Sequence, residues 1–455
     1  MKTSLPSCAI PHALLALAAA IAAPVVHATD GYFQNGYGMK SVGMGGAAVA
    51  VAAEPFGGAV NPGAMAFLDS QWQLGAAWFG PRRSAERTGS GMAGVDGSAV
   101  SGSENFVIPE FGINWRYSPD LAFGLTLSGN GGMNTNYPGG QIGNASACSG
   151  FRGGPVGPYN LLCGSGNLGV DLTQMLIAPY VAWQAVKGHS VGVAPVIAYQ
   201  RFRAEGLQAF DNPAFSTAPG SVTNNGYASS WGVGVRVGYM GQFTEQVAVG
   251  AAYASKIGMG ALGGYRGLFA QDGSFDIPSS LTVGVALRPT PQWLVAVDFE
   301  RIFYDDAPAV ANPSAWIGYC APPQMGGGGM RQYCLGGSDG AGFGWTNVDV
   351  WKIGVEYTVN EQWSLRAGYN HSDNPVQPQD VTFNILAPGV VTNQYSAGAT
   401  WRPDKTSEVT VAFMYAANNS VTGTSLLVGF GLPPTTSETI SMKEYLLGIA
   451  YTRHF

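Results

Sequence analysis

The stretch "WGVGVRVGYM", residues 231–240, alternates two kinds of side chain with a period of two residues. One row holds Trp231, valines and Tyr239, and the other row holds glycines and Arg236. Because successive side chains of a strand point to opposite faces, the pattern predicts a strand with one bulky apolar face and one small or polar face. Aromatic residues near both ends of the apolar row are typical of a strand that crosses a bilayer.

The same alternation recurs along the chain, for example in "SLTVGVALRP" (residues 280–289) and "VDVWKIGVEYTV" (residues 348–359). Short turn-like connections such as "SPD" and "KGH" alternate with long, glycine-rich ones, an asymmetry typical of outer-membrane barrels. We predict fourteen strands, near residues 71–84, 105–118, 120–130, 172–186, 190–204, 227–241, 245–258, 277–288, 292–304, 347–359, 362–373, 393–402, 407–418 and 441–455.

Composition leads to the same fold class. Charged residues make up only 11% of the 455 residues, against about 25% in a soluble protein, so the surface is not built for water alone. After the N-terminus no apolar run reaches the roughly 18 residues of a transmembrane helix. A closed barrel is the remaining way to pair all backbone groups in lipid. The net charge of −6 is scattered, and no basic stripe indicates a nucleic-acid partner.

Residues 1–28 are predicted to be a cleaved signal peptide. Lys2 precedes the apolar run "ALLALAAAIAA" (residues 13–23), and "VHA" ends at Ala28. The protein is therefore expected to be exported. We predict three parts: the signal peptide (1–28), an N-terminal segment (29–68) and a β-barrel (69–455).

Four cysteines remain after residue 28, in two local pairs within Gly/Pro-rich stretches. In an exported protein this spacing favours two disulfides, Cys148–Cys163 and Cys320–Cys334. Metal binding is the weaker alternative because no histidine lies near either pair, and we predict neither a metal nor a cofactor.

Residues 29–68 carry only three charged residues and no period-2 pattern, so they do not fit a solvated tail. A small-residue helix is expected near residues 41–53. A second, short helix is expected after Asn61, an N-cap residue, and Pro62. A fourteen-stranded barrel is too wide for its own side chains to fill, so we expect this segment to lie inside it.

The opening "GYG…GMGGA…NPGAMAFL", residues 36–68, and the fourteen strands resemble the FadL-type outer-membrane transporters of long-chain fatty acids and other hydrophobic compounds. The resemblance implies an all-β, 14-stranded antiparallel transmembrane barrel, monomeric, plugged by an N-terminal hatch. The family's Asn-Pro-Ala hatch motif corresponds to Asn61, Pro62 and Gly63, with glycine replacing alanine.

The resemblance also implies uptake by capture in apolar outer loops, hatch movement and lateral exit through the wall. Long-chain fatty acids are the first predicted substrate, and monoaromatic hydrocarbons or alkanes are the alternative. Outer-membrane lipid and lipopolysaccharide are the expected surroundings in a Gram-negative cell.

Candidate residues follow from these expectations. Phe151, Tyr159, Leu161 and Leu162 suit a capture surface, or equally the packing of a disulfide-bonded loop. Gly129, Gly131 and Gly132 favour a bulge that opens the third barrel strand, although the strand could equally end there. Five lumen-facing cations are candidate partners of a substrate carboxylate, unless they pair with lumen carboxylates: Arg116, Arg236, Arg288, Lys352 and Arg366.

Functions other than transport of hydrophobic compounds predict different features. An enzyme is disfavoured because His371 and Asp373 share a strand face without a nearby nucleophile, so no catalytic residue is predicted. A general porin predicts an open, conducting lumen, and a receptor or adhesin role of the long loops stays open beside transport.

Overall fold

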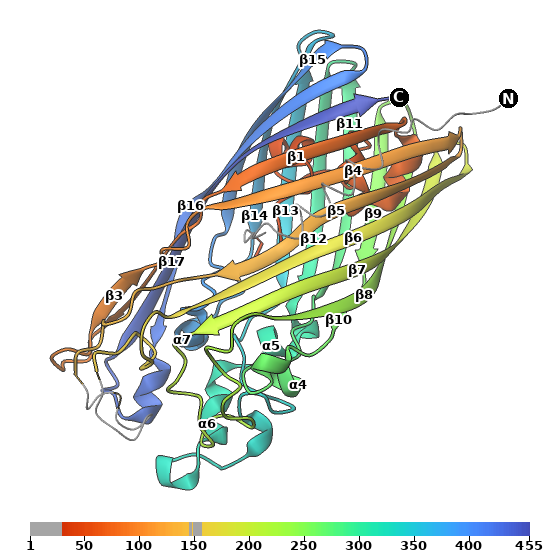
Figure 1. Cartoon of the computed structure of the whole chain (residues 1–455). Coiled ribbons are helices and arrows are strands. Elements are labelled where there is room, and N and C mark those ends of the chain that lie inside the picture. Colours follow the sequence, from red (N-terminus) through yellow and green to blue (C-terminus); the bar gives the residue numbers. More distant parts are fainter. Residues whose placement is uncertain (1–29, 145–147, 149–156) are drawn as a thin grey trace.

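The computed structural model describes residues 30–144, 148 and 157–455. Fourteen antiparallel strands form a closed barrel, in which β1 pairs with both β4 and β17 (Figure 1). The strands of this wall are β1 (Gln71–Phe79), β4 (Phe106–Ser118), β5 (Leu121–Asn134), β6 (Gly169–Val186), β7 (His189–Glu205), β8 (Ala228–Gln242), β9 (Val247–Ala254), β11 (Ser279–Thr290), β12 (Trp293–Phe303), β13 (Val348–Thr358), β14 (Trp363–Ser372), β15 (Asn393–Asp404), β16 (Ser407–Thr424) and β17 (Ser437–His454). The predicted barrel and its strand count are confirmed.

Three further strands extend the wall towards the long loops. The stretch predicted as one strand, 71–84, breaks at Gly80 and Pro81, and β2 (Arg82–Thr88) continues beside β17. β3 (Gly97–Val100) pairs with β2, and β10 (Gly258–Met259) pairs with β8. Sequence periodicity did not predict β3 or β10 because each is too short to show a repeat.

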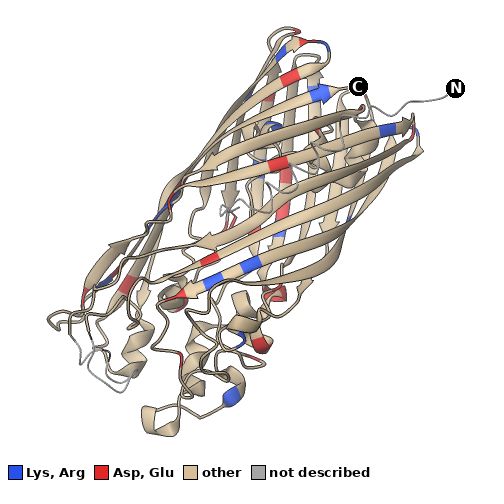
Figure 2. Cartoon of the chain, in the orientation of Figure 1, with Lys and Arg blue, Asp and Glu red and all other residues tan. Residues whose placement is uncertain are grey.

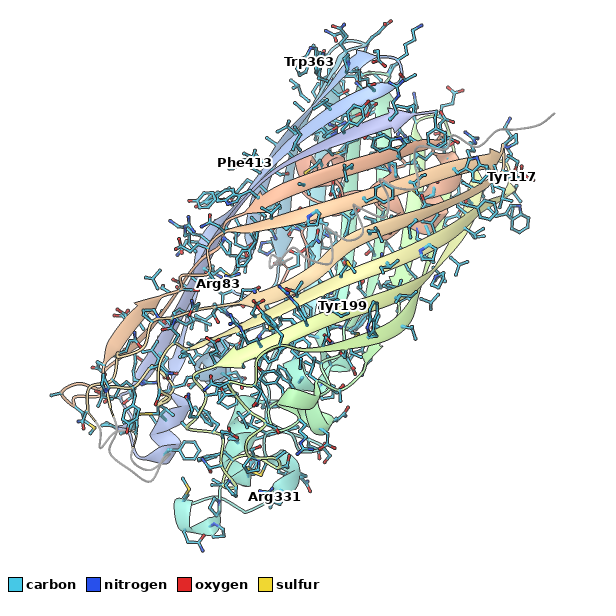
Figure 3. All side chains as sticks on the ribbon, viewed as in Figure 1. Arg83, Tyr117, Tyr199, Arg331, Trp363 and Phe413 are labelled. Carbon is cyan, nitrogen blue, oxygen red and sulfur yellow. A yellow bond between two sulfur atoms is a disulfide. The ribbon has the colours of Figure 1, made fainter. Side chains whose placement is uncertain are left out.

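The burial of the strand residues agrees with the alternation predicted from the sequence: the bulky apolar row faces outward and the small or polar row faces inward. Trp231 is 57% and Val233 71% exposed to the barrel exterior, whereas Arg236 on the other row is buried. Aromatic side chains ring the outer surface near both ends of the wall. Figure 3 shows Trp363 and Tyr117 at the end with the short turns and Tyr199 towards the long loops. Among the described residues no helix is long and apolar enough to cross a membrane.

Residues 30–68, called the plug below, fill the lumen near the short turns (Figure 1). They contain α2 (Met39–Gly43) and the two 3-10 helices η1 (Pro55–Ala59) and η2 (Pro62–Phe67). The expected helix over residues 41–53 is wrong. α2 ends at Gly43, and Gly45 and Gly46 follow with positive φ, a conformation that no helix continues.

The long loops cover the opposite end of the barrel with short helices, as Figure 1 shows for α4 to α7. These elements are η3 (Gly263–Tyr265), α4 (Ala270–Gly273), η4 (Tyr304–Asp306), α5 (Pro308–Ala311), η5 (Ser314–Trp316), α6 (Ile317–Cys320), η6 (Pro323–Met325), η7 (Arg331–Tyr333), η8 (Pro378–Asp380), α7 (Val381–Asn384) and η9 (Leu426–Phe430). Both expected disulfides, Cys148–Cys163 and Cys320–Cys334, are present in these loops.

Candidate functional site

The motif Asn61-Pro62-Gly63 fixes the plug to the wall. The Asn61 side chain is fully buried; its Nδ2 donates to the carbonyls of Val49 (2.6 Å) and Tyr239 (2.9 Å), and its Oδ1 accepts from the Gly63 amide (2.9 Å). One side chain thus caps η2 and joins it both to the rest of the plug and to β8.

Steric contact with the barrel wall explains why position 63 is a glycine. A Cβ at Gly63 would lie 2.7 Å from the Gly238 carbonyl oxygen, inside contact distance. A Cβ on Gly238 or Gly192 of the wall would in turn meet Asn61 or the Pro62–Gly63 backbone. Both surfaces must therefore lack side chains for η2 to approach β7 and β8 this closely.

The same packing continues around the lumen. Gly250 faces Val49, Gly354 and Gly368 face Met44 and Gly45, and Gly448 faces Met39. The small residues of the inward rows are thus where the plug touches the wall.

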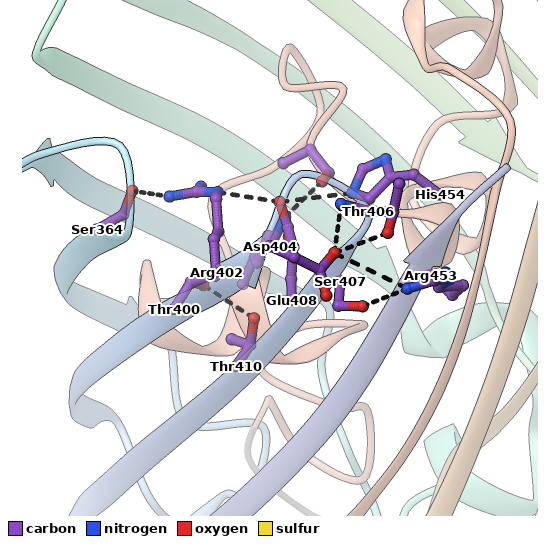
Figure 4. Close-up of polar contacts among 12 residues, drawn as sticks. Ser364, Thr400, Arg402, Asp404, Thr406, Ser407, Glu408, Thr410, Arg453 and His454 are labelled. Atoms are coloured by element: carbon purple, nitrogen blue, oxygen red, sulfur yellow. Dashed lines mark hydrogen bonds and ion pairs between the residues drawn. The ribbon is translucent and has the colours of Figure 1, made fainter.

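Ion pairs and carboxylates hold the other parts of the plug. Asp298 of β12 accepts the amides of Ala48 (2.7 Å) and Val49 (2.9 Å). The Lys40 ammonium pairs with Glu408 at 2.5 Å, and Glu408 also pairs with Arg402 at 3.1 Å. Figure 4 shows the polar network of the β15–β16 turn in which Glu408 lies, with Arg402, His454 and Asp404 around it.

Four of the five predicted lumen cations have partners within the protein. Lys352 pairs with Glu300 (2.7 Å), Arg366 pairs with Glu356 (2.5 Å), and Arg236 donates to the Ala59 carbonyl. Arg116 pairs with the exposed Asp69 at 2.9 Å, near the short-turn end and away from the lumen centre. Arg288 lies two residues before Thr290, the end of β11, also at the short-turn end.

Arg236 and Lys352 nevertheless line one polar pocket between the plug and the wall, together with Tyr37, Asp298 and Glu300. Asp30 of the plug lies nearby, 3.8 Å from the Lys352 ammonium. Burial raises the pKa of Asp30 to about 6; Lys352 opposes this shift and Glu300 adds to it. Two cations, Arg236 and Lys352, thus lie near three carboxylates in this part of the lumen.

A second, apolar pocket lies among the long loops. It is lined by aliphatic and aromatic side chains and one glycine: Leu162, Leu207, Phe210, Leu268, Phe269, Ala309, Leu335, Ala341, Gly342, Phe343, Phe383 and Leu386. Of the predicted capture residues, Leu162 lines it, whereas Tyr159 and Leu161 are buried in loop packing. Phe151 lies outside the described residues.

Aromatic contacts connect this pocket to a smaller one beside β5. Phe269 contacts Phe275 at 4.9 Å between ring centroids, and Phe275 contacts Tyr32 of the plug at 6.1 Å. On the other side Phe343 contacts Trp345 at 6.4 Å, and Trp345 contacts Tyr32 at 5.9 Å. Tyr32 and Trp345 both line the smaller cavity with Gly132.

The wall is incomplete at the predicted glycines. β4 and β5 pair only between Phe111–Ser118 and Leu121–Leu127, so Phe106–Glu110 and Ser128–Asn134 face each other without ladder hydrogen bonds. The β5–β6 register shifts between Gly129 and Gly131, which marks a bulge at this point. Gly129, Gly131 and Gly132 thus lie on the free edge of β5.

The plug covers this free edge from inside. Phe33 forms a β-bridge with Gly131, and the Gln34 Nε2 donates to the Gly129 carbonyl at 2.5 Å. A Cβ on Gly131 would collide with the Tyr32 carbonyl. The opening in the ladder is therefore closed by residues 32–34 in this structure.

Arg83 is a site residue that the sequence analysis missed. Its guanidinium donates to the carbonyls of Ser103 (3.2 Å) and Asn134 (2.5 Å), which lie on the two sides of the gap. Figure 3 labels Arg83 on this part of the wall. Counting alternate residues from the outward Trp78 places position 83 on the inward row, so the sequence did contain the signal.

The family of the chain follows from its match to the model of outer membrane protein transport proteins (OMPP1/FadL/TodX), which spans residues 19–455. The chain belongs to this family. The family is one of transport proteins rather than enzymes, and its members are outer-membrane barrels of Gram-negative bacteria. No curated protein matches the sequence.

Solved structures share the fold. The chain is similar to the toluene transporter TodX of Pseudomonas putida (TM-score 0.61, 17% identity, 92% of this chain and 99% of that one). It is similar to a Pseudomonas aeruginosa FadL homologue (0.62, 14%, 93% and 100%) and to the Ralstonia pickettii toluene transporter TbuX (0.60, 17%, 92% and 99%). At these identities the likeness is one of fold.

Proposed function

We propose that this protein takes up small uncharged hydrophobic compounds, with monoaromatic hydrocarbons as the first class. The observation that carries the proposal is the loop cavity, whose described lining residues include no charged side chain to bind a carboxylate. Solved structures titled as toluene transporters share the fold and support this choice.

The proposed route has three stages. A compound enters the loop cavity, moves along the aromatic contacts past Phe343 and Trp345, and reaches the small cavity beside Gly132. Tyr32 and Phe33 then leave the β5 edge, and the compound passes sideways between β4 and β5 into the membrane. Lateral exit keeps an apolar solute out of the polar lumen around Arg236 and Lys352.

Long-chain fatty acids are the second candidate. The polar cavity that brings Arg236 and Lys352 together favours them, because a carboxylate is attracted by two cations. We place them second because Lys352 already pairs with Glu300 and Asp30.

Uptake of labelled toluene and labelled oleate into cells that lack the native gene distinguishes the candidates. Phe343→Asp puts a charge into the loop cavity and is expected to lower toluene uptake by about tenfold. Tyr319→Asp is the matched control, because Tyr319 is an exposed aromatic residue of the same long loop that does not line the cavity.

Oleate uptake that falls in Lys352→Gln while toluene uptake stays unchanged would reverse the order of the two substrates. Equal uptake of toluene by wild type and Phe343→Asp would contradict the proposed capture site. Mass spectrometry of the compound that co-purifies in mild detergent provides an independent identification.

A further inference from the structure

The outer surface of the barrel changes character at one level near the long loops. The outward row passes from Tyr199 to Arg201 on β7, from Phe299 to Arg301 on β12, and from Tyr445 to Lys443 on β17. Aromatic side chains mark the edge of the hydrocarbon region, so the charged residues one step beyond them lie at the level of lipid headgroups. Figure 2 shows charged residues near the loop ends of several strands, β7 among them.

The other cations named at this level have partners in the protein, and Arg201 lies over the Tyr227 ring at 4.7 Å. Arg301 makes two contacts with Asp349, at 2.9 and 3.1 Å, and Arg203 pairs with Glu205 at 2.9 Å. Each of these two arginines thus has a carboxylate that balances its charge.

The facing pair Arg82 and Lys443 differs, because only one of its two cations has a carboxylate partner among the described residues. They are directly opposite each other on β2 and β17, so their side chains leave the same outward face of the wall. Arg82 pairs with Glu104 at 2.8 Å, but no ion pair or side-chain hydrogen bond of Lys443 is found among the described residues. Two cations opposite each other with one carboxylate leave a surplus positive charge, an arrangement that destabilises a strand pair unless an anion joins it.

The neighbouring residues complete a surface for a phosphorylated lipid. The next outward pair towards the loops is Ser84 and Ser441, whose hydroxyl oxygens are 2.7 Å apart. Towards the membrane centre lie the Tyr415–Tyr445 ring pair, at 5.3 Å, and the exposed Leu447 and Ile449. Cations and hydroxyls thus stand above an apolar strip on which acyl chains can lie.

We infer that Arg82 and Lys443 bind a phosphate of the outer-leaflet glycolipid, lipopolysaccharide, with Ser84 and Ser441 as additional donors. The inference goes beyond uptake, since it concerns the lipid-facing exterior and requires only that the barrel sits in the outer membrane. A phosphate shared by the two cations removes their mutual repulsion.

The test titrates bisphosphorylated lipid A into the detergent-solubilised full-length protein and measures the bound fraction by native mass spectrometry. The double variant Arg82→Ala/Lys443→Ala is expected to bind about tenfold more weakly than wild type. Arg301→Ala is the matched control, because it removes an outward arginine of the same level that is already paired, and its binding is expected to equal that of wild type. Glu104→Gln frees Arg82 and is expected to strengthen binding.

A second arm uses the same lipid with both phosphates removed, which is expected to bind wild type and the double variant with the same weak affinity. Equal binding of bisphosphorylated lipid A by wild type and the double variant would overturn the inference, as would equally tight binding of the phosphate-free lipid to wild type. Heat-modifiable migration on gels reports whether each variant is folded. If the double variant does not fold, Lys443→Gln replaces it, and its binding of bisphosphorylated lipid A is also expected to be weaker than that of wild type.

Discussion

The plug meets the barrel wall in two different ways. Towards β7, β8 and β9 its backbone lies against glycines of the wall, and buried hydrogen bonds of Asn61 to β8 and of Asp298 on β12 fix it. Towards β5, residues 32–34 and Tyr37 lie against a strand edge that lacks a ladder partner. The tightly packed side is an anchor, and the β5 side is where the least structure must be broken for the wall to open.

The largest expected effect tests whether the plug closes the lumen at all. Deleting residues 30–68 removes all three plug helices and is expected to change a nearly non-conducting barrel into a pore with large, steady conductance, because fourteen strands leave a wide lumen. Single-channel recording in planar bilayers measures this. A wild-type conductance as large as that of the deletion variant would support a general porin instead.

The anchor side is tested by Gly238→Val. The added side chain would collide with Asn61, so we expect the close contact between η2 and β8 to be lost, at a cost in stability of about 1–3 kcal/mol. The variant should show partial conductance and faster protease cleavage within residues 30–68. Gly258→Val is the control, because a Cβ there meets nothing within 4 Å on the neighbouring β10. Similar cleavage rates in the two variants would show that the contact between η2 and Gly238 does not hold the plug.

A smaller effect is expected at the strand edge. Gly131→Ala would push against the Tyr32 carbonyl and displace only residues 32–34, so toluene uptake should change without the conductance rise of Gly238→Val. Hydrogen exchange of the Phe33 and Gln34 amides reports the displacement. Conductance equal to that of Gly238→Val would mean that the two sides of the plug release together.

The smallest effect is expected far from both surfaces. Arg116→Ala breaks an ion pair with Asp69, whose side chain is 81% exposed, so the free energy of unfolding should change by less than about 0.5 kcal/mol. Uptake of both labelled substrates should stay at the wild-type rate. A specific loss of oleate uptake in this variant would restore Arg116 as a carboxylate contact.

The sequence by itself determined the barrel, its strand number and its two faces. Each strand has lipid on one side and the lumen on the other, so its side chains alternate with a period of two residues, as in residues 231–240. It also pointed to the capped turn at Asn61 and to the two disulfide pairs, since both depend on residues close together in the chain. The break at Gly80-Pro81 departed from the expected single strand, although a Gly-Pro pair is a local signal for a turn. The short α2 departed from expectation because local propensity does not report where the plug must turn to fit the wall.

Only the tertiary structure decided what the inward residues contact. It gave Lys352 and Arg366 their carboxylate partners and placed Arg83 across the β4–β5 gap. It also showed that Gly63 must be small because Gly238 lies against it. These contacts join different strands, or the plug and the wall, and the pairing of strands and the position of the plug in the closed barrel, which no local pattern encodes, bring them together.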